Sequence, residues 1–128
     1  MPAPQSIIEL VQRFDANREA YHSGKYNEAQ LRIEFLNPFF VALGWDVLNT
    51  KGYALDYREV ISEDSIAIEG QAKAPDYAFR IGRERKFFVE AKKPSVDIAG
   101  DIHPAYQLRH YAWNVHLPLS ILTDFEEF

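Results

Sequence analysis

Three residues, Asp76, Glu90 and Lys92, have the types and spacing that could do chemistry on the surface of a sheet. They fall in two apolar-rich segments, residues 75–81 and 86–92, which we expect to form neighbouring β-strands joined by a short polar connection. Because side chains alternate along a strand, Glu90 and Lys92 share one face. The sequence therefore predicts two carboxylates and an amine close together on a strand pair.

The register of this hairpin decides whether the two carboxylates meet. Pairing Ile81 with Arg85 across a three-residue loop places Tyr77 opposite Val89 and puts the two carboxylates directly opposite each other. The reactive face then also carries two apolar residues, and the other face is wholly apolar and suited to packing against helices. The residues expected on that apolar face are Tyr77, Phe79, Ile81, Phe87, Val89 and Ala91.

Carboxylates directly opposite each other on neighbouring strands repel, so they need a cation to compensate them. Hard oxygen ligands suit Mg²⁺, for which Mn²⁺ can substitute, and such ions keep several waters when one or two carboxylates bind them. The open positions can take a phosphate oxygen and an attacking water. We expect Lys92 to act electrostatically in this hydrolytic site, with a role as base as the alternative.

The pattern Pro75-Asp76 followed by Glu90-Ala91-Lys92 resembles the PD-(D/E)xK motif of a large nuclease superfamily. The three catalytic residues alone are a weak signal, because such short patterns occur by chance in many sequences. Their order and their hairpin context make the resemblance specific. It implies a metal-dependent DNA endonuclease that hydrolyses phosphodiester bonds.

The flanking segments narrow the resemblance. Residues 27–32 and 37–46 resemble the opening helix of the nuclease domains of type I and type IIG restriction enzymes, and residues 121–124 resemble the strand that follows the motif helix in the same proteins. The resemblance spans residues 27–124. It implies a restriction-endonuclease-like core of α/β (α+β) class, with a mixed central β-sheet flanked by helices.

The resemblance also implies which groups bind the metal. In such families the two motif acids are ligands, which here are Asp76 and Glu90. The backbone carbonyl that follows the glutamate, here that of Ala91, often joins them, and a helix glutamate completes the site. That glutamate corresponds to Glu28, with Glu34 on the same expected helix as the alternative.

A further element of part of the superfamily, a glutamine followed four residues later by a tyrosine, matches Gln107 and Tyr111. Residues four apart lie on one helix face, so the resemblance implies that Gln107 supports the catalytic site. The alternative is a surface amide beside a core aromatic residue. Arg32, four residues after Glu28, is open to a simple helical ion pair with it.

The remaining pattern predicts one domain over residues 1–128, in the order ααββββαβ. Pro38 is expected to kink or restart the second helix. Residues 62–74 are expected to be a polar loop or an irregular edge, and residues 94–103 are expected to be a loop. We expect Trp45 and Trp113 in the core. Helices are predicted at residues 6–23, 27–44 and 104–115, and strands at 46–48, 55–61, 75–81, 86–92 and 119–123.

Composition limits the class of protein. The chain has no cysteine, no secretory signal and no apolar run long enough to cross a bilayer, so we expect a cytoplasmic protein without membrane contact. Its net charge of −5 has the wrong sign for a domain that grips DNA by itself. We therefore expect the cleavage module of a restriction enzyme, as the N-terminal fragment of a larger restriction-modification protein.

The expected partners follow from that hypothesis. They are double-stranded DNA, methyltransferase, target-recognition or motor domains outside this chain, and a second copy in a transient dimer for double-strand cleavage. Two alternatives remain at this stage, a non-catalytic module that keeps the nuclease fold and a stand-alone repair or junction nuclease. A blander alternative is that Asp76, Glu90 and Lys92 form a solvated strand face with an ordinary ion pair.

Overall fold

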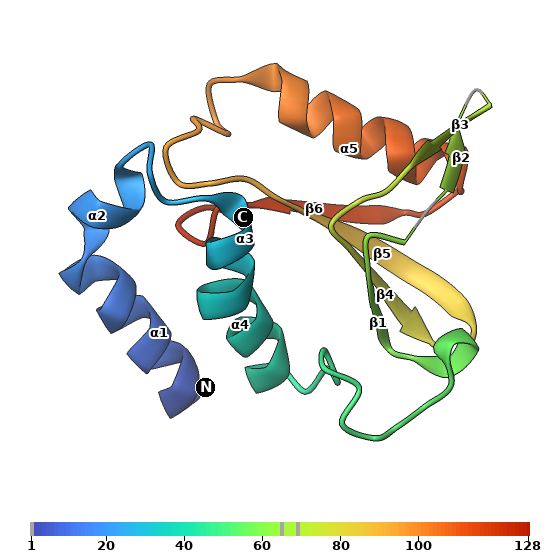
Figure 1. Cartoon of the computed structure of the whole chain (residues 1–128), viewed down its shortest axis with the longest axis horizontal. Helices are drawn as coiled ribbons and strands as arrows, with labels where there is room; N and C mark the ends of the chain where they lie inside the picture. The colour runs from blue at the N-terminus through green and yellow to red at the C-terminus, as the bar shows by residue number, and fades with distance from the viewer. Residues whose placement is uncertain (1, 65, 69) are drawn as a thin grey trace.

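A four-stranded mixed sheet forms the centre of the computed structural model, which describes residues 2–64, 66–68 and 70–128 (Figure 1). The strand order is β1-β4-β5-β6, with antiparallel neighbours except for the parallel pair β5 and β6. The strands are β1 (Val60–Ser62), β4 (Tyr77–Ile81), β5 (Glu84–Ala91) and β6 (Leu119–Thr123). The predicted α/β class with a mixed sheet flanked by helices is confirmed.

Helices cover both faces of the sheet. The N-terminal helices pack on one face and α5 packs on the other (Figure 1). The helices are α1 (Gln5–Ala16), α2 (Arg18–His22), α3 (Glu28–Leu31), α4 (Asn37–Ala42) and α5 (Ile102–Asn114). In the part of the chain that the structure describes, none of these helices has the length and apolar character that crossing a membrane requires.

The first predicted helix, residues 6–23, is wrong as a single element. The structure has α1 and α2 in its place, separated at Asn17, whose φ of −125° lies outside the helical range. The Asn17 side chain donates to the carbonyl of Arg13 at 3.1 Å, so it competes locally with the helical hydrogen bonds.

The second predicted helix contains a widened turn. Between α3 and α4 lies a π-helical turn, η1 (Arg32–Leu36), in which the Asn37 amide donates to the carbonyl of Arg32, five residues back. Pro38 follows in the first turn of α4 and has no amide of its own to donate to the carbonyl of Glu34. The Arg13 side chain donates to that carbonyl instead. A kink or restart is predicted at Pro38, but the backbone stays helical through Leu36 and Asn37, and α4 begins at Asn37 directly after the π-helical turn.

The predictions between residues 46 and 74 are largely wrong. Residues 46–48 form a turn, in which the Asp46 carboxylate accepts the amide of Thr50 at 2.7 Å. Residues 55–57 form a short 3₁₀ turn, η2 (Leu55–Tyr57), so that only β1 remains of the strand predicted there. Residues 62–74, which are predicted to be a polar loop or an irregular edge, contain a separate antiparallel pair, β2 (Ile66–Ile68) and β3 (Gln71–Lys73), while residues 65 and 69 lie outside the described residues.

The central hairpin has the predicted register near the site but a different turn. Tyr77 lies opposite Val89 as predicted, whereas Ile81 pairs with Glu84 across a two-residue turn in which Gly82 has a φ of 63°. A register shift between Phe79 and Arg80 separates the pairing at the turn from the pairing near the site, where the predicted register holds.

The two hydrophobic clusters separate according to the sheet faces. The first joins Tyr77, Phe79, Val89 and Ala91 to the N-terminal helices, and the second joins Ala78 and Phe88 to α5. Two predictions of burial are wrong. Ile81 lies beside the turn, 63% exposed, and Trp113 is 79% exposed on the outer face of α5, whereas Trp45 packs on Phe79 and Phe87.

Candidate active site

Asp76 is held rigidly just before β4. Its side chain is buried, and Oδ2 accepts the backbone amide of Ala91 on β5 at 2.7 Å. Its backbone carbonyl accepts the amide of Glu63 at 3.0 Å, which ties the end of β1 to the same position. Asp76 therefore points across the hairpin toward β5, as the register argument from the sequence requires.

Glu90 is the buried carboxylate of β5, with only 7% of the residue exposed. Its Oε2 atom is fully buried and has no hydrogen-bond partner among the described residues. Burial, and then the nearby charge of Asp76, raise the pKa of Glu90 to about 8. A buried carboxylate oxygen without a donor is costly unless a proton or a cation compensates it, so this arrangement fits a cation site.

Glu28 reaches the same cluster from the first turn of α3. Asn27 begins this helix by accepting the amide of Gln30 at 2.8 Å. Burial, and then the charge of Asp76, raise the pKa of the half-buried Glu28 to about 7. The alternative, Glu34, is exposed and accepts a hydrogen bond from the Tyr26 hydroxyl. The structure thus brings Glu28, and not Glu34, together with the strand carboxylates.

Lys92 and Arg32 are the cations that act on these acids. Lys92 directly follows β5, where its backbone amide donates to Thr123 on β6 at 3.0 Å, and its charge lowers the pKa of both Glu28 and Glu90. Arg32 is only partly exposed, and its Nη1 lies 3.4 Å from Oδ1 of Asp76. The spacing of Arg32 from Glu28 predicts a helical ion pair between those two residues, and it gives no sign of this contact with Asp76, which lies 44 positions later in the chain.

The predicted support from α5 reaches the site through Tyr111. The exposed Gln107 donates from Nε2 to the Tyr111 hydroxyl at 2.7 Å. Tyr111 itself is buried, and burial and then the charge of Glu90 raise its pKa. Gln107 therefore fixes a buried tyrosine beside Glu90 and does not itself lie among the acids.

The donor set suits a hard divalent cation, although the side chains alone do not surround one. Over residues 2–64, 66–68 and 70–128, no three Asp, Glu, His or Cys side chains converge closely enough to hold an ion between them. One or two carboxylates are a common protein contribution to a Mg²⁺ site, because this ion retains several waters. The unpartnered Oε2 of Glu90 is consistent with such a site.

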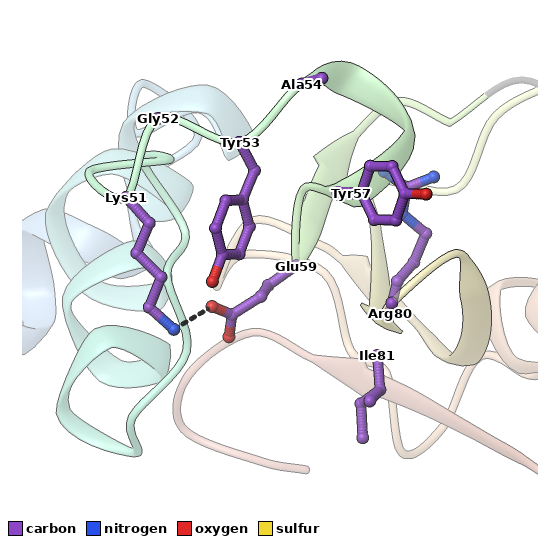
Figure 2. A pocket seen from close by; sticks show the side chains of 9 residues that line it. Lys51, Gly52, Tyr53, Ala54, Tyr57, Glu59, Arg80 and Ile81 are labelled. Atoms are coloured by element: carbon purple, nitrogen blue, oxygen red, sulfur yellow. Dashed lines mark hydrogen bonds and ion pairs between the residues drawn. The ribbon is translucent and has the colours of Figure 1, made fainter.

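A surface pocket lies at the turn end of the β4–β5 hairpin, away from Asp76 and Glu90. It has a volume of about 590 Å³ and includes Tyr53, Tyr57, Arg80 and an ion pair of 2.6 Å between Lys51 and Glu59 (Figure 2). It borders the turn after β4, whereas Asp76 precedes β4. None of the predicted site residues lines this pocket.

Comparison with known proteins gives one informative similarity. The chain is 44% identical over 128 residues to the type II restriction enzyme and methyltransferase RM.Eco57I of Escherichia coli, which covers 98% of this chain. The chain spans about 13% of the length of that relative. No family model and no solved structure matches the chain. The similarity supports a domain related to restriction enzymes.

Proposed function

We propose that this chain is a Mg²⁺-dependent endonuclease domain that hydrolyses DNA phosphodiester bonds as the cleavage module of a restriction enzyme. The observation that carries the proposal is the buried, unpartnered Oε2 of Glu90 beside Asp76, at the position of a nuclease motif. The similarity to a restriction enzyme and methyltransferase supports the same class of function.

The carboxylates of Asp76 and Glu90 and the backbone carbonyl of Ala91 would hold the cation, with Glu28 approaching from α3. When bound, Mg²⁺ polarises a phosphodiester and lowers the pKa of a coordinated water. The amide of Ala91 fixes one oxygen of Asp76, which keeps that carboxylate oriented before the cation enters. Preorganisation of this kind removes a reorganisation cost from the reaction.

Lys92 is the chain's own cationic group at the reacting centre. It lies one residue beyond β5, next to Glu90 and Ala91, and its charge already acts on both glutamates. Its ammonium group would orient a nucleophilic water or offset charge that develops on the phosphate. On the α5 side, Gln107 would support the site indirectly, because it donates to the hydroxyl of the buried Tyr111, on which the charge of Glu90 acts.

The acidic balance supports a modular arrangement. A net charge of −5 disfavours strong independent binding to polyanionic DNA. Affinity and sequence choice would then come from methyltransferase, target-recognition or motor domains, with a second copy joining for double-strand cleavage. The relative combines restriction and methyltransferase functions in its name, and this chain matches only 13% of its length.

Metal binding tests the proposed site directly. Isothermal titration of the isolated chain with Mn²⁺, above neutral pH, should show binding that Asp76→Asn and Glu90→Gln each weaken by at least about 100-fold. Both substitutions keep the side-chain shape and remove the negative charge.

The matched control is Asp124→Asn. Asp124 is also a buried carboxylate, and its oxygen accepts the amides of Glu126 and Glu127 at 3.0 and 2.8 Å, which an asparagine oxygen can also accept. This variant should bind Mn²⁺ like the parent. Absence of binding in the parent, or equal binding in all variants, would contradict the proposed site.

A further inference from the structure

Arg32 lies at an unusual place for a positively charged group, directly against a candidate metal ligand. Its Nη1 is 3.4 Å from Oδ1 of Asp76 and 3.9 Å from Oε1 of Glu63. The other Asp76 oxygen, Oδ2, already accepts the amide of Ala91. The oxygen of Asp76 that is not fixed by the backbone therefore faces a guanidinium.

In the metal-free protein, the contact between Arg32 and Asp76 offsets part of the negative charge around Asp76. Glu28, Asp76 and Glu90 form an acidic cluster, and each glutamate has a raised pKa partly because of Asp76. Lys92 lowers the pKa of both glutamates, whereas Arg32 acts on Glu28. Arg32 thus supplies the positive charge on the α3 side of the cluster.

The Arg32 guanidinium also has a second carboxylate partner within reach, that of Glu63. Glu63, whose side chain is 69% exposed, places its Oε1 atom 3.9 Å from the same Nη1 atom of Arg32 that contacts Asp76. A cavity of about 270 Å³ opens beside both residues and is also bordered by Ala29, Ile33 and Tyr77. Arginine side chains reorient by rotamer changes, so Arg32 can leave Asp76 for Glu63 without movement of the backbone.

We infer that Arg32 is a positioning residue that serves as the resident counter-ion of Asp76 and competes with the divalent cation for that carboxylate. The inference rests on the proposed function of the site. Before metal enters, Arg32 holds Oδ1 of Asp76 and stabilises the acidic cluster. When a cation binds, the like charge of the guanidinium opposes it, and Glu63 receives Arg32.

The test is Mn²⁺ titration of Arg32→Gln by calorimetry. The variant should bind Mn²⁺ roughly tenfold more tightly than the parent, because a like charge has been removed from beside the ion. It should also unfold at lower denaturant concentration without metal. Arg32→Lys keeps the charge and should restore most of the parent affinity. A residue that only supports the fold would instead weaken binding when it is removed.

A second variant moves the affinity in the opposite direction. Glu63→Gln leaves Asp76 as the remaining partner of Arg32 and should weaken Mn²⁺ binding by about threefold. This effect should disappear in the Arg32→Gln background if it acts through the guanidinium, and it should persist there if it is only the loss of a negative charge near the cation. Persistence in the double variant would overturn the inference.

Arg85→Gln is the matched control, since Arg85 forms another partly buried ion pair, 2.6 Å from Asp64, outside the acidic cluster. It should lower stability and leave Mn²⁺ affinity unchanged. Unchanged or weaker binding by Arg32→Gln, with normal binding by the parent, would overturn the role of Arg32 alone. Failure of the parent to bind Mn²⁺ would overturn the proposed metal site and this inference together.

Discussion

Replacing Asp76 by asparagine is expected to reduce Mg²⁺-dependent DNA cleavage by about a thousandfold or more, and Lys92→Ala is expected to have a similar effect. Asp76 would lose a metal-binding charge, and Lys92 would lose the cation that faces developing charge on the phosphate. The two losses differ in kind: Asp76→Asn should weaken Mn²⁺ binding by at least about 100-fold, whereas Lys92→Ala should retain it or strengthen it.

The measurement calls for a complete enzyme as well as the isolated chain. A chimera in which this chain replaces the matching 13% of the Escherichia coli relative would supply the remaining domains, and a plasmid substrate would report nicking and linearisation. Asp124→Asn in the same chimera is the control for loss of a buried carboxylate. The proposal of an endonuclease fails if the parent chimera cuts DNA and Asp76→Asn cuts it equally well.

Glu90→Gln is expected to stabilise the metal-free protein at alkaline pH. In the folded protein the pKa of Glu90 is raised to about 8, whereas in the unfolded chain it returns to roughly 4.3. Between these values the folded state binds the extra proton, so the free energy of unfolding falls as pH rises and levels off above the folded pKa. Glu28, with its pKa of about 7, adds to the same trend.

The size of this effect is on the order of a few kcal/mol, because each pKa unit corresponds to about 1.4 kcal/mol and neighbouring charges share the shift. Urea unfolding in the presence of a chelator should show that the free energy of unfolding of the parent falls steeply from pH 5 to pH 9. For Glu90→Gln the fall should be much smaller. Glu84→Gln, on the same strand with an exposed side chain, should behave like the parent. Equal pH dependence of Glu90→Gln and the parent would refute the unfavourable burial of this carboxylate.

The reactive end of the hairpin was predictable because strand alternation and antiparallel pairing constrain it strongly. The predicted turn was nevertheless wrong, since Ile81 pairs with Glu84 and a register shift then restores the opposition of Tyr77 and Val89. The register shift therefore compensates for the error of one residue in the predicted turn. The sequence could not show this, because a two-residue and a three-residue turn around Gly82 are both compatible with its residue types.

The roles of Glu28 and Arg32 depended on long-range packing. Helical spacing correctly placed both on one helix, but it suggested that they pair with each other. The structure instead directs Arg32 toward Asp76, 44 positions later in the chain. Local spacing cannot predict such a contact, because the orientation of α3 against the sheet comes from the buried aromatic and aliphatic side chains of the core.

The secondary-structure predictions that are wrong between residues 46 and 74 have a similar physical cause. Residues 46–48 have strand-like composition, yet the Asp46 carboxylate accepts amides of Thr50 and Lys51 and closes a turn. β3 consists of exposed residues and has no apolar alternation that could reveal it. Trp113 was assigned to the core by residue type, although the opposite face of α5 supplies the buried contacts.

The π-helical turn at Arg32–Leu36 has a consequence for how this domain could change over generations. Such a turn holds one more residue than an α-helical turn, so the helix before it is rotated by about 100° relative to the helix after it. Deleting one residue there would rotate Glu28 away from Asp76, and it would also turn the fully buried Leu31 of α3 out of the core. The extra residue of this turn therefore places Glu28 toward Asp76 and Leu31 in the core at the same time.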